Sequence, residues 1–347
     1  MLLADMGADV IKVESPEGDG MRNWPPHTGG YSENFASLNR NKRSIVLNLK
    51  QPGDAETARR LCLSGDVVLE NFRPGVMKRL GLGYADLARE KPALVYCSIS
   101  AFGQEGPRSQ EGGFDVTLQA IGAVMSVTGE PGGAPVKCGV PLTDFAAGLY
   151  AAFAIAAKLF EGKGGHIDVP MLGTTLAIAA LQTSEYFGTG RDPQKLGSAH
   201  PRNAPYQAFR CKDGHFVMAA GNDELYRRAC EGFGREDLLK DERFGTTALR
   251  AKNQKALQEL LEATFATLTA GECLDRMRSR GVPCAPINTY SQALADPQVA
   301  HYGWVRPLEL PGGLTTRTFV SPLHPALPGK PPRLGEHTAE IMKELEA

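Results

Sequence analysis

Asp144 is the acidic residue whose position in the sequence is best suited to covalent chemistry. It lies at the first turn of the most apolar predicted helix, directly after Gly139-Val140-Pro141-Leu142-Thr143. An aspartate there can cap the helix, because it accepts hydrogen bonds from free N–H groups and is favoured by the helix dipole. It can also act as a nucleophile, since attack on an acyl thioester gives a mixed anhydride and divides acyl transfer into two easier steps. Free N–H groups of the same turn would then stabilise an oxyanion.

The common catalytic and binding motifs are absent from the sequence. It contains no G-x-G-x-x-G opening a helix, no G-x-x-x-x-G-K-[ST] and no G-x-S-x-G. These absences argue against dinucleotide binding, a phosphate-binding Walker loop and a hydrolase nucleophile elbow. There is no H-E-x-x-H or Cys-x-x-Cys, and the 7 His are dispersed, so the sequence predicts no metal site. The remaining possibilities are carboxylate chemistry or a binding protein.

The composition is that of a soluble globular protein. Lys plus Arg number 38 and Asp plus Glu 39, a formal net charge of −1 that argues against a nucleic-acid partner. The 7 Cys are odd in number and scattered, which predicts reduced thiols in a cytosol-like compartment. We therefore expect a cytoplasmic protein, or one of the mitochondrial matrix if a targeting segment has been removed.

No membrane segment is predicted. The longest apolar run, Phe145 to Phe160, has 16 residues and contains Gly148 and Lys158. A spanning helix needs about 20 apolar residues. The run therefore predicts a buried core helix, and the start of the sequence shows no secretory signal pattern.

Strands alternate with helices in the first half, which predicts an α/β fold with a parallel sheet. Strands are expected at 10–14, 43–49, 66–70, 94–99 and 166–171, and helices at 54–64, 114–125, 144–161 and 172–187. Asp54 is placed to cap the first of these helices. Gly162 follows the third as a C-terminal cap would.

A length of 347 residues predicts roughly two domains. We expect a large α/β domain over 1–187, a Gly- and Pro-rich linker over 188–205, and a small α+β domain over 206–300. Lys212-Asp213-Gly214 between apolar runs predicts a hairpin that opens the small domain, followed by helices at 222–233 and 251–267. Residues 301–347 are expected to return to the large domain as an extended Pro-rich segment with a C-terminal helix. The chain opens without a first strand, so we expect it to lack its natural start.

An ordered set of short motifs resembles the class III CoA-transferase family (CaiB/BaiF, formyl-CoA transferase-like). They are distributed from residue 1 to about 340, and only the whole set is specific. The motifs are Gly7 to Glu14, Asn39 to Ser44, Glu70 to Gly75, Gly113 to Gly122, Ser126 to Gly129, Gly139 to Gly148, Pro205 to Phe209, Gly281 to Pro286 and Leu334 to Thr338.

The resemblance implies a Rossmann-like large domain that binds CoA, a smaller domain, and an interlocked homodimer with its active site between domains. It implies acyl-CoA and a carboxylic acid as substrates, with no metal, nucleic-acid or membrane partner. It makes Asp144 the nucleophile, passing through aspartyl anhydride and aspartyl–CoA thioester intermediates.

The resemblance also implies a CoA site formed by Asn71, Phe72, Arg79 and Phe114, with Leu47 near the adenine. Physically, an arginine can pair with a phosphate through two hydrogen bonds. By residue type alone, Arg79 would be a solvated helix charge, Asn71 a turn cap and Phe72 a core residue.

Two alternatives to a transferase stay open, and the first is an acyl-CoA racemase or isomerase of the same family. Racemases of the family have a histidine where Phe114 stands, followed by an aspartate matching Asp115. Phenylalanine cannot move a proton, which disfavours racemisation and leaves Asp115 as a structural cap or an indirect participant. The other alternative is a catalytically impaired CoA-binding paralogue, because family members carry an additional strand and loop ahead of Met1 that contact CoA.

The stretch Gly197-Ser198-Ala199-His200-Pro201, leading into Pro205, resembles family members that act on dicarboxylic acids, of the succinyl-CoA:glutarate type. The resemblance implies that His200 or Arg202 binds the distal carboxylate of the substrate, since a guanidinium suits carboxylate geometry. The alternative is a solvated linker.

Overall fold

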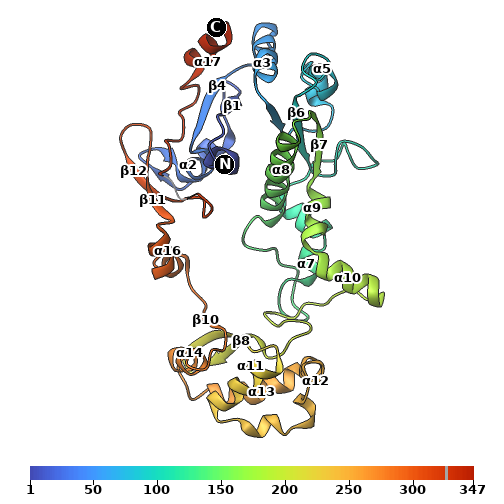
Figure 1. The fold of residues 1–347 in the computed structure, drawn as a ribbon, viewed down its shortest axis with the longest axis vertical. Coiled ribbons are helices and arrows are strands. Elements are labelled where there is room, and N and C mark those ends of the chain that lie inside the picture. Colours follow the sequence, from blue (N-terminus) through green and yellow to red (C-terminus); the bar gives the residue numbers. More distant parts are fainter. Residues whose placement is uncertain (325–326) are drawn as a thin grey trace. The chain divides into compact units, whose positions relative to one another are not determined.

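The computed structural model describes residues 1–324 and 327–347 (Figure 1). The chain forms two compact units. Unit 1 contains residues 1–124, 138–184 and 294–347, and unit 2 contains residues 125–137 and 185–293. All seven cysteines are free, as expected for reduced thiols.

Unit 1 is built on two parallel sheets. The first has the order β5 (Val67–Glu70), β6 (Val95–Ser100) and β7 (Gly165–Pro170). The second pairs β1 (Val10–Glu14) with β4 (Lys42–Val46), also in parallel. These sheets confirm the predicted mixed α/β class with parallel strands. Tyr96 and Cys97 in the central strand are buried, as expected for a sheet covered on both faces.

Helices and short hairpins complete unit 1 around these sheets. They are α1 (Leu2–Asp5), η1 (Gly20–Asn23), β2 (His27–Thr28), β3 (Tyr31–Ser32), α2 (Glu33–Asn39), α3 (Pro52–Ser64), α4 (Val76–Arg79), α5 (Tyr84–Leu87), α6 (Asp115–Ile121), α8 (Leu142–Glu161), α9 (Met171–Ile178), α16 (Pro297–Tyr302), β11 (Val305–Glu309), β12 (Thr315–Phe319) and α17 (Thr338–Glu346). The expectation that Asp54 caps α3 is wrong. Asp54 is the third residue of that helix, and its carboxylate accepts a hydrogen bond from the Asn48 N–H at 2.7 Å.

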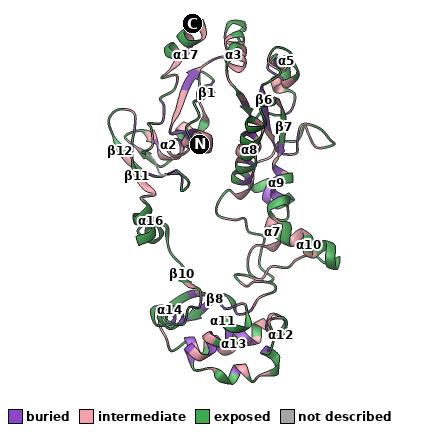
Figure 2. Cartoon of the chain, viewed as in Figure 1, coloured by how far each residue is buried: buried purple, intermediate pink, exposed green. Residues whose placement is uncertain are grey.

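Helix α8 packs along β6 and β7, and it ends at Gly162 in the left-handed conformation, as predicted. Ala147, Ala151 and Ile155 face the sheet and are buried with Val95. By length and composition alone this helix could cross a membrane. Within the protein, 28% of its most apolar window is buried. One face of α8 packs on the sheet as part of the core, and the other face is left exposed (Figure 2).

Three predicted helices are each divided in two by a short irregular step. The division falls at Gly122-Ala123, at Ala179 and at Asn253, where the backbone leaves helical values. The resulting pairs are α6 and α7 (Val124–Val127), α9 and α10 (Ala180–Thr189), and α12 (Thr247–Lys252) and α13 (Gln254–Phe265). Both halves of each pair share the apolar pattern of one long helix, so periodicity alone does not reveal the step.

Unit 2 is an α+β unit around a three-stranded antiparallel sheet. The predicted hairpin over Lys212 and Asp213 is present as β8 (Tyr206–Cys211) and β9 (Gly214–Ala219), and β10 (Cys284–Pro286) pairs with β9. The further elements are α11 (Asp223–Phe233), η2 (Glu236–Leu239), η3 (Glu242–Phe244), α14 (Ala270–Arg278) and α15 (Tyr290–Leu294). Phe209, Phe216 and Phe265 form the aromatic centre of its core.

The C-terminal part of unit 1 differs from the predicted extended segment. Residues 305–319 form the hairpin β11–β12, whose turn is closed by Leu310 N–H donating to Leu314 C=O at 2.7 Å. Gly312 and Gly313 both have positive φ, which glycine adopts at no steric cost. Helix α17 packs on β4 and α3, with Ile341 fully buried.

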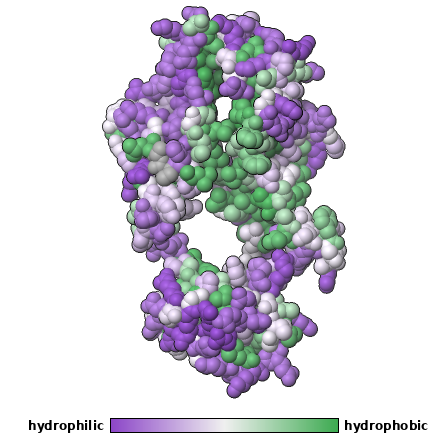
Figure 3. Space-filling model, in the orientation of Figure 1, coloured by the Kyte–Doolittle hydropathy of each residue, from purple (hydrophilic) through white to green (hydrophobic). Residues whose placement is uncertain are grey.

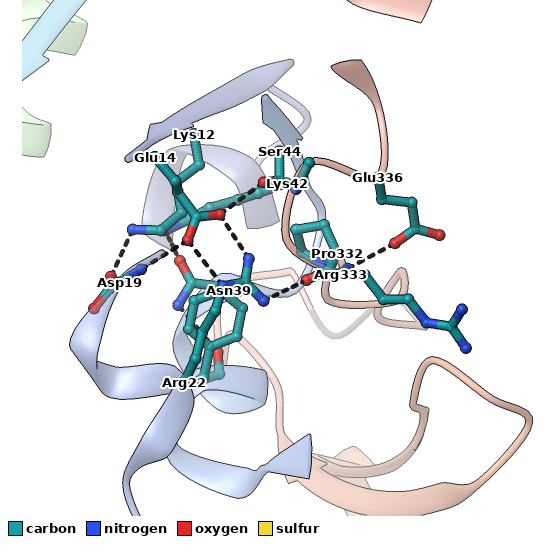
Figure 4. A network of polar contacts seen from close by, with 12 residues as sticks. Lys12, Glu14, Asp19, Arg22, Asn39, Lys42, Ser44, Pro332, Arg333 and Glu336 are labelled. Atoms are coloured by element: carbon teal, nitrogen blue, oxygen red, sulfur yellow. Dashed lines mark hydrogen bonds and ion pairs between the residues drawn. The ribbon is translucent and has the colours of Figure 1, made fainter. Parts of the chain in front are cut away.

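A polar network ties this C-terminal part to the β1–β4 sheet (Figure 4). Arg22 binds the buried carboxylate of Glu14 with two nitrogens and donates a third hydrogen bond to Pro332 C=O. The Ser44 hydroxyl donates to Glu14 Oε1 at 2.7 Å, the same oxygen that Arg22 Nη2 contacts. Burial alone would raise the pKa of Glu14, but the bonds from Arg22 and Ser44 outweigh it and lower that pKa.

Candidate functional site

The segments that leave the carboxyl ends of β5 and β6 carry several of the residues that the sequence singled out in unit 1. Asn71 and Phe72 directly follow β5, and the segment that follows β6 leads into Phe114 and Asp115. Helix α8 runs antiparallel to β7 because it leads directly into that strand and packs along it. Its first turn therefore lies towards the same carboxyl edge, which is where α/β sheets bind ligands.

Asp144 is the third residue of α8 and is exposed. It does not cap the helix, because the N-cap is Pro141 and no side-chain cap bond forms there. Within the residues that the structure describes, no hydrogen bond ties up its carboxylate oxygens. A helix start offers N–H groups without intrahelical partners. Asp144 thus combines a free carboxylate with nearby backbone donors.

Asp115 supplies the cap that Asp144 does not. Its carboxylate Oδ1 accepts the Thr143 N–H at 3.0 Å and the Thr143 Oγ1–H at 2.8 Å. Its Oδ2 accepts Gln119 Nε2–H at 2.7 Å. Thr143 and Gln119 are both fully buried. The first turn of α8 is therefore fixed to the start of α6 through one shared carboxylate.

Gln119 extends this arrangement to the segment before α8. Its Oε1 accepts the Cys138 N–H at 2.8 Å, so one side chain joins Asp115 to the chain entering α8. Sequence patterns identified Asp115 only as a possible cap, without naming the helix that it caps. The partner could not be foreseen, because residues 115 and 143 meet only through the tertiary fold.

The electrostatic environment makes Asp144 more basic than an ordinary aspartate. Desolvation by the surrounding protein raises its pKa, and the negative charge of Asp115 raises it further. A more basic carboxylate is a stronger nucleophile once it is ionised. The two acidic residues thus differ in their surroundings: Asp115 is hydrogen-bonded to Thr143 and Gln119, and Asp144 has a raised pKa and no hydrogen bond among the described residues.

The loop after β5 is held so that one aromatic ring is presented to solvent. Asn71 Nδ2 donates to Ile99 C=O at 2.7 Å, and the buried Glu70 carboxylate accepts the Phe72 N–H at 2.7 Å. The Phe72 ring remains 48% exposed. Such a ring on a fixed loop is suited to contact a flat or apolar part of a ligand.

Arg79, Phe114 and Leu47 occupy three different environments. Arg79 ends α4 and is exposed, and in the described ranges no carboxylate pairs with its guanidinium. Phe114 is 79% exposed, and its N–H donates to Thr117 Oγ1 at 2.9 Å. Leu47 instead is buried in a cluster with Ile45 and Ile341, and its N–H donates to Glu14 C=O at 2.9 Å.

His200 and Arg202 both lie in unit 2, on one turn. The His200 Nδ1 accepts the backbone N–H groups of Arg202 and Asn203 at 3.2 and 3.1 Å. The Arg202 guanidinium is exposed and pairs with Glu185 of α10 at 3.1 Å. Glu185 could not be identified from the sequence, since a lone glutamate in a helix carries no pattern. No cluster of three or more metal-ligating side chains occurs in residues 1–324 and 327–347.

Comparison with known proteins decides the family. A family model described as CoA-transferase family III matches residues 1–338. The chain belongs to this family. The protein is a class III CoA-transferase, acting between acyl-CoA thioesters and carboxylic acids.

Relatives of this transferase match over nearly the whole chain. Succinyl-CoA:glutarate CoA-transferase of Homo sapiens is 38% identical over 99% of this chain and 81% of its own length. Succinate–glutarate CoA-transferase of Agrobacterium fabrum is 39% identical over 99% of this chain and 90% of its own length. A crystal structure of a CaiB/BaiF family protein from Brucella suis has a TM-score of 0.85 at 38% identity, covering 99% of this chain and 93% of that one.

Proposed function

We propose that this class III CoA-transferase moves CoA between an acyl-CoA and a dicarboxylic acid, with Asp144 as the nucleophile. The free carboxylate of Asp144, raised in pKa at the start of α8, carries the proposal. The acids named for similar transferases are glutarate, oxalate, mesaconate and citramalate, and each is a dicarboxylic acid. This shared chemistry supports a dicarboxylic substrate.

The reaction proceeds through alternating anhydride and thioester intermediates. The Asp144 carboxylate attacks the thioester carbonyl, the C–S bond breaks, and CoA thiolate leaves a mixed anhydride behind. The thiolate attacks the aspartyl carbonyl and expels the donor carboxylate, which gives an aspartyl–CoA thioester. The acceptor carboxylate attacks this thioester to form a second anhydride. Attack of the thiolate on its acceptor carbonyl releases the new acyl-CoA and restores Asp144.

The CoA subsite uses the residues at the strand ends of unit 1. Arg79 pairs with a phosphate, since its guanidinium is exposed and has five donors. Asn71 and Phe72 flank the pantetheine and adenine parts of CoA. Leu47 lies behind the adenine, and Phe114 contacts the thioester end of the acyl-CoA. In unit 2, Arg202 binds the second carboxylate of the acid, while His200 positions the turn that carries Arg202.

The proposed assembly is an interlocked homodimer. Large apolar side chains remain exposed along α8, α9 and α10, and Figure 3 shows apolar residues gathered over the α8 region. An exposed apolar surface of this kind marks an interaction site. The exposed side chains are Phe145, Leu149, Tyr150, Phe153, Leu159, Phe160, Leu176, Ile178, Leu181, Tyr186 and Phe187.

Trapping the covalent intermediate tests the nucleophile. The protein is incubated with succinyl-CoA, and intact mass spectrometry and hydroxylamine trapping follow the adduct. We expect an adduct on Asp144 and its loss in Asp144→Ala, whereas Asp192→Ala, at an exposed position in unit 2, retains it. An adduct that persists in Asp144→Ala would contradict the proposal. Exchange of the α-proton without CoA transfer would instead identify a racemase.

A further inference from the structure

The turn that carries Arg202 is anchored on both sides within unit 2. The Ser198 hydroxyl accepts the Ala208 N–H at 3.0 Å, and the His200 N–H donates to Tyr206 C=O at 3.0 Å. Arg250, which is fully buried, donates through Nε to Ala204 C=O at 2.9 Å. These bonds fix the backbone before and after Arg202. Its guanidinium therefore projects from a rigid base, which reduces the entropy lost when a ligand binds.

The ring of His200 completes this support. Because Nδ1 accepts two backbone N–H groups, the neutral ring carries its proton on Nε2. Partial burial and the neighbouring Arg202 charge lower the pKa of His200, which favours that neutral form. A neutral His200 keeps the turn closed, so Arg202 stays presented to solvent.

Glu185 engages Arg202 only weakly. A single contact of 3.1 Å joins one guanidinium nitrogen to one carboxylate oxygen, and the two side chains are 47% and 34% exposed. A guanidinium can bind a carboxylate through two parallel hydrogen bonds, and this pair forms only one of them. Exposed pairs of this kind contribute little stability and exchange readily. A carboxylate of the protein thus occupies a site that a substrate carboxylate can take.

We infer that Glu185 is a placeholder carboxylate: it pairs with Arg202 in the substrate-free enzyme and is displaced by the distal carboxylate of a dicarboxylic acid. This inference rests on the proposed function and adds a specificity-determining residue to it. When a dicarboxylic acid binds, its distal carboxylate replaces the Glu185 carboxylate as the partner of the Arg202 guanidinium. A monocarboxylic acid brings no second charge, so it leaves the Glu185–Arg202 pair in place. Glu185 therefore sets the affinity for dicarboxylic acids by competing with them.

The sign of the effect of Glu185→Gln tests the inference. With acetyl-CoA as donor, steady-state rates are measured for glutarate and for butyrate as acceptors. We expect the KM for glutarate to fall roughly two- to fivefold, because an exposed ion pair no longer has to be broken. The glutarate-to-butyrate ratio of kcat/KM should rise by a similar factor. An unchanged or higher KM for glutarate overturns the inference, since it makes Glu185 irrelevant or a support for Arg202.

Two further variants separate the possible failures. Arg202→Gln should abolish the preference for glutarate, and Glu185→Gln should then have no added effect in the double variant. Glu224→Gln is the matched control, because Glu224 forms exposed ion pairs with Arg227 and Arg228 in the same unit. If the unsubstituted enzyme transfers CoA to neither acid, the proposed function fails. If the enzyme transfers CoA but Glu185→Gln leaves the glutarate-to-butyrate ratio of kcat/KM unchanged, only the placeholder role fails.

Discussion

At the scale of single residues, two aspartates only 29 positions apart have opposite surroundings. Asp115 is bonded to Thr143 and Gln119, whereas Asp144 has no bond among the described residues and an elevated pKa. From the sequence, Asp144 was expected in the first turn of an apolar helix, and the structure places it there. The sequence could not predict that Asp115 caps α8, or that Glu185 faces Arg202, because both contacts depend on tertiary packing.

The raised pKa of Asp144 predicts a gain in stability when its charge is removed. Above the ordinary value of 3.8, the ionised form is disfavoured in the folded protein relative to the unfolded chain. Asp144→Asn should therefore raise Tm at pH 7, by at most about 3 °C for an exposed charge. The gain should disappear as the pH falls below the ordinary aspartate value, where both states are protonated.

Thermal unfolding of Asp144→Asn and of the unsubstituted protein between pH 3 and pH 8 measures this effect. Asp192→Asn is the control, because Asp192 is exposed and makes the same change of charge in unit 2. A lower Tm for Asp144→Asn at pH 7 would contradict the electrostatic argument. A gain in stability with a loss of transfer is the trade-off expected of a reactive group.

At the scale of elements, prediction succeeded where a local signal sets the structure. Lys212-Asp213-Gly214 predicted the β8–β9 hairpin, and Gly162 predicted the end of α8. It failed at Ala179 and Asn253, where continuous apolar patterns hide a break between two helices. It also failed for the β11–β12 hairpin, because Pro307 and the surrounding Pro-rich composition suggested an extended chain.

The junction of α8 and β7 gives a prediction at this scale. A Cβ added at Gly164 would collide with the Pro92 carbonyl oxygen and would lie 2.7 Å from the Ala93 carbonyl carbon. Backbone atoms cannot yield as a flexible side chain does, so Gly164→Ala should destabilise the protein by about 1–3 kcal/mol. Gly53→Ala, in α3 with no atom within 4 Å of the added Cβ, should be close to neutral. Urea unfolding of both variants checks this, and equal midpoints would contradict the close approach.

At the scale of the whole molecule, the two units are made from interleaved stretches of chain. Unit 2 takes residues 125–137 as well as 185–293. Composition and turns indicate only contiguous segments, and they predict a small domain at 206–300 and a linker at 188–205. The segment 125–137 shares no pattern with residues 185–293, which is why its place in unit 2 could not be inferred.

The exposed apolar face of α8 predicts self-association of the whole chain. Phe153 is 76% exposed and lies in the middle of this helix. Phe153→Glu should shift the protein from dimer towards monomer, because a charge buried in an apolar interface is costly. Sedimentation velocity measures the shift, and Leu249→Glu, an exposed apolar position in unit 2, is the control. A monomeric unsubstituted protein would contradict the proposed assembly.

The packing of α17 on the β1–β4 sheet has a consequence for biosynthesis. Ile341 is buried against Ile45 and Leu47, and the Ser44 N–H donates to His337 Nδ1 at 3.2 Å. His337 follows Ser44 by 293 positions, so the sheet is synthesised well before the helix that covers it. Until α17 has been synthesised, the apolar sheet face that Ile341 covers stays open, and completion of this core waits for that helix.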